Sequence, residues 1–143
     1  CNRCGDCQKA CPHQAIECLE HRFPHLRGTP IIRPSDAPCH LCSDRPCQKA
    51  CATGALNGLS SQKMGQAHIN PLECLAWQRS TCTTCHERCP VSETITLDEL
   101  SRPSISSEKC LGCGICQFSC PAPRNAIAIT VNSHRSPSIR SPK

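Results

Sequence analysis

Cysteines are the residues of this chain with the clearest chemistry, and their spacing divides them into four groups. Seventeen of the 143 residues are cysteine, a fraction of about 12%, which is well above the level that indicates a metal site or a disulfide scaffold. Sixteen of them fall into tight runs, so they converge on small objects rather than spreading along the chain. The groups are Cys1, Cys4, Cys7 and Cys11 (group I), Cys39, Cys42, Cys47 and Cys51 (group II), Cys74, Cys82, Cys85 and Cys89 (group III), and Cys110, Cys113, Cys116 and Cys120 (group IV).

The spacing of groups I and IV is C-x2-C-x2-C-x3-C-P, which is typical of a [4Fe–4S] cluster. Group II has four residues between its second and third cysteines, and group III has seven between its first and second. Zinc sites usually pair C-x2-C with a second such pair or with histidines across a longer loop. The spacing therefore favours four [4Fe–4S] clusters as cofactors, with these sixteen cysteines as the metal ligands.

Four thiolates around each cluster leave no iron open to a substrate, and an open position is what catalysis at a metal needs. The sequence therefore predicts an electron carrier or electron-transfer subunit that is not itself an enzyme and has no catalytic residues. Cys18 lies outside every group, and we expect it to be a small apolar side chain on a strand.

In two-cluster ferredoxins the fourth cysteine of one motif ligates the other cluster. We expect group I to exchange its fourth cysteine with group IV, and group II with group III, because the two extended loops would then face each other. Pairing group I with II and group III with IV is the alternative, and the spacing leaves it open. The expected sets are Cys1, Cys4, Cys7 and Cys120; Cys39, Cys42, Cys47 and Cys89; Cys74, Cys82, Cys85 and Cys51; and Cys110, Cys113, Cys116 and Cys11.

The groups are internal repeats, and each is followed by a short segment that favours a strand. Residues 7–11 recur letter for letter as 47–51. Strands are expected within 15–16, 55–56, 94–97 and 126–131, whereas 57–70 is expected to be a surface loop.

We predict an α+β fold of two nested bacterial ferredoxin-like modules, irregular and rich in loops. The four-cluster region is expected to span 1–131. Its outer module would be 1–35 plus 105–131, around an inner module of 36–104. The basic segment 132–143 is expected to be disordered.

Composition restricts the partners. The formal charge is +5 with cysteines counted as neutral, but four oxidised clusters with their thiolates would bring it to about −3. A nucleic-acid partner is therefore not expected, and without a run of 18 apolar residues neither is a membrane span. Residue 1 is a motif cysteine rather than Met, so the sequence looks like a fragment or a processed form.

With these motifs in hand, the chain resembles the ferredoxin-type proteins of the NapG and MauM type, from periplasmic nitrate reductase and methylamine utilisation systems. The resemblance lies in residues 37–42 and 51–56 around group II, 73–78 with 89–90 in group III, and 93–97. It covers about residues 1–131. Ala52 departs from the pattern, because proline usually follows the fourth cysteine.

This resemblance implies a periplasmic four-cluster protein that is exported folded by the twin-arginine route. Its redox partners would be a membrane quinol dehydrogenase and a c-type cytochrome or terminal reductase. The resemblance also implies the exchange of cysteines between groups I and IV and between groups II and III. The related NapF-type proteins suggest a second possibility, a cytoplasmic maturation factor for a molybdenum reductase. A twin-arginine leader in the complete gene would favour the carrier.

Overall fold

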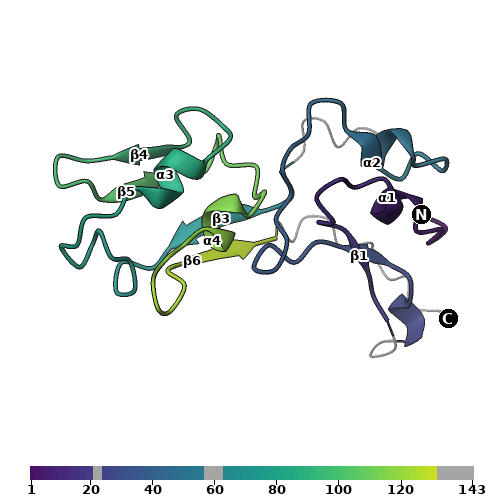
Figure 1. Cartoon of the computed structure of the whole chain (residues 1–143), viewed down its shortest axis with the longest axis horizontal. Helices are drawn as coiled ribbons and strands as arrows, with labels where there is room; N and C mark the ends of the chain where they lie inside the picture. Colours follow the sequence, from purple (N-terminus) through teal and green to yellow (C-terminus); the bar gives the residue numbers. More distant parts are fainter. Residues whose placement is uncertain (21–23, 57–62, 132–143) are drawn as a thin grey trace, which may run out of the picture.

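Short helices and strands joined by longer loops make up the chain. The computed structural model describes residues 1–20, 24–56 and 63–131. The elements lie in two groups, side by side along the long axis of the molecule (Figure 1). With three aromatic residues and 13 prolines in 143 residues, the sequence has few large apolar side chains to support long elements. The mixed, loop-rich α+β character predicted from the sequence is confirmed.

The first group of elements contains cysteine groups I and II. Strands β1 and β2 pair antiparallel, with Glu17 opposite Ile31, and helix α1 packs against helix α2. We call this half of the molecule, residues 1–56, the first module. Its elements are α1 (Asp6–Lys9), β1 (Glu17–Cys18), the 3-10 helix η1 (Pro24–Leu26), β2 (Pro30–Ile31) and α2 (Pro46–Lys49).

The second group of elements contains cysteine groups III and IV, and we call residues 63–131 the second module. Strand β3 pairs antiparallel with β6, and β4 with β5. Helices α3 and α4 pack against each other, and α4 also contacts β6. The elements are β3 (Gln66–Ile69), α3 (Thr84–Arg88), β4 (Ile95–Leu97), β5 (Pro103–Ile105), α4 (Ile115–Phe118) and β6 (Ile127–Thr130).

Each of the α-helices α1 to α4 carries the third cysteine of one group, and in α1, α2 and α4 a residue with positive φ comes just before the helix. In α1 and α4 this residue is Gly5 or Gly114, with φ of +80° and +90°, a backbone conformation that glycine adopts without a Cβ clash. In α2 the same place is taken by Arg45, with φ of +45°. The extra residues of group II therefore lengthen the loop without changing how its helix begins.

Two of the four predicted strands are confirmed, as β4 and β6. Near 15–16 the strand begins later, at Glu17, and 55–56 form a turn rather than a strand. The prediction of a surface loop over 57–70 is wrong for its last part, because β3 forms there and buries Ala67 to 3% exposure. Residues 57–62 and the predicted disordered tail at 132–143 lie outside the described residues.

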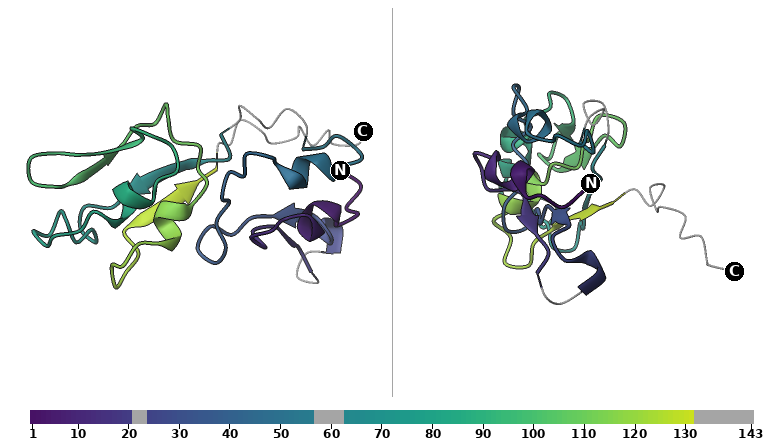
Figure 2. Two further views of the ribbon diagram at one scale, coloured as in Figure 1. Left: turned by 45° about the horizontal axis from the view of Figure 1, so that its top comes forward. Right: turned by 90° about the vertical axis from the view of Figure 1, so that its right-hand side faces the viewer.

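The nested order of the modules is corrected by the structure. In Figure 1 and in the left view of Figure 2, the first module forms one end of the molecule and the second module the other. The described elements of 1–56 contact one another, as do those of 63–131. The outer module predicted from 1–35 plus 105–131 does not form, because β6 pairs with β3 rather than with a strand of the first module.

Candidate iron–sulfur sites

Four cavities are each lined by four cysteine side chains, three from one group and the fourth from another. We name each site after the group that provides three of its cysteines. Site I contains Cys1, Cys4, Cys7 and Cys51; site II contains Cys39, Cys42, Cys47 and Cys11; site III contains Cys74, Cys82, Cys85 and Cys120; and site IV contains Cys110, Cys113, Cys116 and Cys89.

The fourth cysteines are exchanged within each module, not between the outer and inner groups as predicted. Cys11 and Cys51 change places between groups I and II because α1 lies against α2. Cys89 and Cys120 change places between groups III and IV because α3 lies against α4. The prediction that Cys120 joins group I and Cys89 joins group II is therefore corrected, and the alternative pairing holds.

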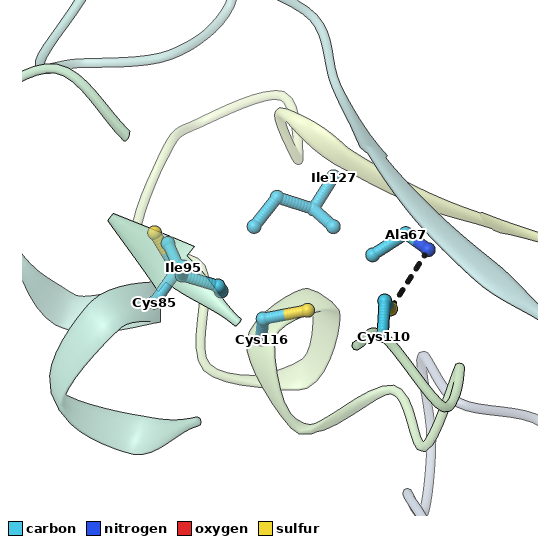
Figure 3. Close-up of a cluster of buried hydrophobic side chains, with 6 residues drawn as sticks. All are labelled: Ala67, Cys85, Ile95, Cys110, Cys116 and Ile127. Carbon is cyan, nitrogen blue, oxygen red and sulfur yellow. Dashed lines mark hydrogen bonds between the residues drawn. The ribbon is translucent and has the colours of Figure 1, made fainter. Parts of the chain in front are cut away.

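Backbone amides point at two of the sulfur atoms. The N–H of Ala15 donates to Sγ of Cys11 at 3.3 Å, and the N–H of Ala67 donates to Sγ of Cys110 at 3.4 Å. The second of these bonds is the dashed line in Figure 3. Such donors stabilise a thiolate more than a thiol. Sequence reasoning missed both amides, although Ala15 stands in an Ala–Ile pair that recurs after group IV.

Burial controls the protonation of the inner thiols when no metal is present. It raises the pKa of Cys85 to about 11 and that of Cys116 to about 12, with neighbouring thiols adding to the effect. Burial likewise raises the pKa of Cys39 and of Cys113. Cys51 has the opposite shift, since hydrogen bonds led by that from the Leu56 backbone lower its pKa. A buried thiolate requires a compensating positive charge, which a metal centre supplies.

The donor sets fit a cluster better than a single ion. In the part of the chain that the structure describes, no three His, Cys, Asp or Glu side chains gather closely enough to hold one metal ion. Zinc would need four donors around one point, with sulfur at about 2.3 Å. In a [4Fe–4S] cluster each cysteine binds a different iron, so the four thiols surround a larger space. Four thiols around a cavity match that requirement at all four sites.

Each of the four sites has at least one neighbouring site. Sites I and II share the first module, and sites III and IV share the second. Between the modules, the N–H of Cys39 in site II donates to the carbonyl oxygen of Cys113 in site IV at 3.0 Å. Met64 and Leu111 from the second module also line the cavity of site II. The order along the molecule is therefore site I, site II, site IV and site III.

Other candidate residues lie beside the sites rather than in them. Cys18 is half-buried on β1, near enough to Cys7 to affect its pKa, and it lines none of the four cavities. The rings of His13 and His40 stack at 3.8 Å and line the edge of site II. No helix within the described residues is long and apolar enough to cross a membrane.

Two family profiles match the chain. Residues 1–55 match a 4Fe-4S dicluster domain, which coincides with the first module and its two sites. Residues 101–122 match a 4Fe-4S binding domain, which covers group IV and the strand before it. The chain therefore contains [4Fe–4S] ferredoxin domains, as predicted.

Curated relatives are found among three kinds of ferredoxin-type protein. The methylamine utilization ferredoxin-type protein MauM of Methylorubrum extorquens is 37% identical over 90% of this chain and 64% of its own length. The ferredoxin-type protein NapG of Escherichia coli is 35% identical over 90% of this chain and 63% of its own length. The NapF protein of Escherichia coli is 27% identical over 85% of this chain and 71% of its own length.

The predicted resemblance to MauM and NapG is thus confirmed, and this chain spans less than two thirds of the length of those two relatives. The relation to NapF is more distant. The chain contains 4Fe-4S binding domains and is similar over 90% of its length to the MauM and NapG ferredoxin-type proteins.

Proposed function

We propose that this chain carries electrons along a row of four [4Fe–4S] clusters, in the spatial order site I, site II, site IV and site III. The sixteen cysteines of groups I to IV would hold the clusters. When bound, such clusters accept and release single electrons at potentials set by their surroundings.

The observation that carries this proposal is the backbone hydrogen bond between Cys39 and Cys113. Each of these residues belongs to a different module and a different site. Together with Met64 and Leu111 at the cavity of site II, this contact brings the two pairs of sites together. Within each module the neighbouring sites are joined by a short stretch of chain, as from Cys7 to Cys11 and from Cys85 to Cys89. This arrangement favours electron transfer from one end of the molecule to the other.

The same sites argue against a role as an enzyme. Each cavity offers four thiols, and four thiolates complete the coordination of a [4Fe–4S] cluster. No position would remain for a substrate on iron, and substrate chemistry at a metal needs such a position. The role of this chain is therefore to conduct electrons within an oxidoreductase system rather than to transform a small molecule.

The redox partners are proposed by analogy with the relatives of this chain. MauM is named for methylamine utilization, and NapG is of the nitrate reductase type in the resemblance described above. By analogy, this chain would take electrons from a membrane quinol dehydrogenase and pass them to a c-type cytochrome or a terminal reductase. It would work in the periplasm after export in the folded state.

A second candidate function is supported by the match to NapF, which extends over 85% of this chain. In that case the chain would act in the cytoplasm, as an iron–sulfur factor in the maturation of a molybdenum reductase. Redox kinetics separate the two functions. A carrier is oxidised by a cytochrome or reductase in a rapid second-order reaction, whereas a maturation factor binds an immature reductase and does not exchange electrons with it.

The direct test is to measure iron and acid-labile sulfide on protein purified without oxygen, followed by EPR after reduction with dithionite. Four clusters require about sixteen of each per chain, and adjacent reduced clusters should give spin-coupled signals. About eight of each would mean that one module is empty. Zinc in place of iron would overturn the proposal.

A further inference from the structure

The hydroxyl of Thr94 is a buried polar group that forms no hydrogen bond with any residue that the structure describes. Thr94 is 2% exposed, and its Oγ1 has no hydrogen-bond partner. Its backbone is fully engaged, since its N–H donates to Val91 and its carbonyl oxygen accepts from Ser106. A buried hydroxyl without a hydrogen bond costs free energy, so such groups usually have a partner.

Thr94 lines the cavity of site IV together with Cys89, Cys110, Cys113 and Cys116. Among the described residues around this cavity, every other side chain apart from these cysteines is apolar, and Gly112 and Gly114 have none. Figure 3 shows the same region, with Cys116 between Cys110 on one side of the view and Ile95, the neighbour of Thr94 in the chain, beside Cys85 on the other. Apart from the cysteine sulfurs, no side chain of this lining could accept a hydrogen bond from the hydroxyl, and the hydroxyl has no partner among the described residues.

The fold does not itself require a hydroxyl at this place. Thr94 follows the fourth cysteine of group III by five residues, and Ile16 follows the fourth cysteine of group I by five. Ile16 is also buried and lines the cavity of site II, which is the matching site of the other module. An apolar β-branched side chain thus fills the equivalent position, so the hydroxyl of Thr94 calls for an explanation other than packing.

We propose that Thr94 is a positioning and tuning residue for site IV, whose hydroxyl donates a hydrogen bond to a sulfur atom of the cluster held there. This inference rests on the proposed function, because it requires a cluster in site IV. The reduced cluster carries one more negative charge than the oxidised one. A hydrogen-bond donor stabilises the reduced state more, and so raises the reduction potential.

The test is an EPR-monitored redox titration of the loaded full chain, comparing Thr94→Val with the unchanged protein. Valine keeps the branched shape and removes the hydroxyl. We expect one of the four clusters to be about tenfold harder to reduce, a shift of about 59 mV for a one-electron couple, while the other three do not change. Thr94→Ser, which keeps the hydroxyl, should restore the potential towards that of the unchanged protein.

Thr96→Val is the matched control. Thr96 lies two residues away on β4, and its hydroxyl bonds to that of Ser104 on the exposed side of the hairpin, at 2.9 Å. This variant should leave all four potentials unchanged. If Thr94→Val also leaves them unchanged, or if Thr96→Val gives the same shift, the proposed hydrogen bond is wrong.

Iron and sulfide are measured on the same samples, which separates two failures. An unchanged protein without about sixteen irons would contradict the proposed function itself. If Thr94→Val loads fewer irons than the unchanged protein, Thr94→Ala takes its place in the titration, because it removes the hydroxyl and adds no new group. A loaded Thr94→Ala with four unaltered potentials would equally overturn the inference.

Discussion

The backbone N–H of Cys39 and the carbonyl oxygen of Cys113 lie 3.0 Å apart, where the two modules of the molecule meet. Gly114 of group IV makes this approach possible. A Cβ on Gly114 would lie 2.2 Å from Cβ of Pro34, which belongs to the first module. The contact between sites II and IV therefore depends on a position where any side chain would collide.

Gly114→Ala is predicted to separate the two modules. The new methyl group would overlap Pro34, in addition to the strain of a φ of +90°. We expect the loaded protein to lose its visible absorbance at a lower temperature, and the EPR coupling between sites II and IV to weaken. Iron content at low temperature should stay near that of the unchanged protein, since no ligand is removed.

Gly5→Ala is the control for that prediction. Gly5 occupies the same place before α1, with φ of +80°, but a Cβ there would have nothing within 4 Å. The substitution should lower the free energy of unfolding only by the strain of a left-handed residue, about 1–2 kcal/mol. It should leave the EPR coupling between sites II and IV unchanged. Equal effects of the two substitutions would mean that strain, not contact between the modules, explains the loss.

The retention of iron by the loaded protein should increase with pH. Only the thiolate binds iron, and burial raises the pKa of Cys85 to about 11 and that of Cys116 to about 12 in the metal-free protein. Protons therefore compete with iron below these values, so retention should improve as the pH rises and fail as it falls. The measurement is the rate at which a chelator bleaches the protein between about pH 6 and pH 9. A rate that does not change over this range would contradict the pKa shifts.

Without metal the same thiols have the opposite effect on stability. A thiol whose pKa is raised on folding stabilises the folded metal-free chain at any pH below the pKa that the thiol has in the unfolded chain. That contribution is lost as the pH rises through the pKa of the thiol in the folded chain. Any residual structure of the metal-free chain should therefore weaken towards alkaline pH. Circular dichroism of the chelated protein at increasing pH measures this.

Trp77 should report on site III. It is the only tryptophan of the chain, and its Nε1–H donates to the carbonyl oxygen of Pro103, a residue that lines the cavity of site III. Arg102 lies over its ring at 4.7 Å. A bound cluster absorbs broadly and should quench the indole, so fluorescence should rise when a chelator removes the iron. Trp77→Phe gives the background. If the fluorescence of Trp77 is the same with and without iron, the prediction of a cluster near this ring is wrong.

The sequence was sufficient to predict the cysteine groups, the mixed fold and two strands, because all of these depend on local spacing. It was not sufficient for the pairing of the groups. The exchange of Cys11 with Cys51 depends on α1 packing against α2, and that of Cys89 with Cys120 on α3 packing against α4. The longer loops of groups II and III suggested that these two groups face each other, yet elements that follow one another in sequence usually lie together.

Two other features could be found only from the structure. Strand β3 was missed because its residues Gln66–Ile69 show no clear alternation, and it becomes a strand by pairing with β6 some 60 residues later along the chain. Thr94 looks like an ordinary strand residue in the sequence. Its interest comes from burial and from an unpartnered hydroxyl at site IV, neither of which spacing can indicate.

The central claim, that Cys11 completes site II, is tested most directly by the iron content of the double variant Cys11→Ala with Cys39→Ala. Each single variant should lose one cluster and keep about twelve irons, and the double variant should also keep about twelve because both changes affect the same site. The pair Cys11→Ala with Cys110→Ala affects two sites and should keep about eight. The opposite result would be about eight irons for the first pair and about twelve for the second. It would contradict the pairing of group I with II and of group III with IV, and would support the pairing of group I with IV and of group II with III.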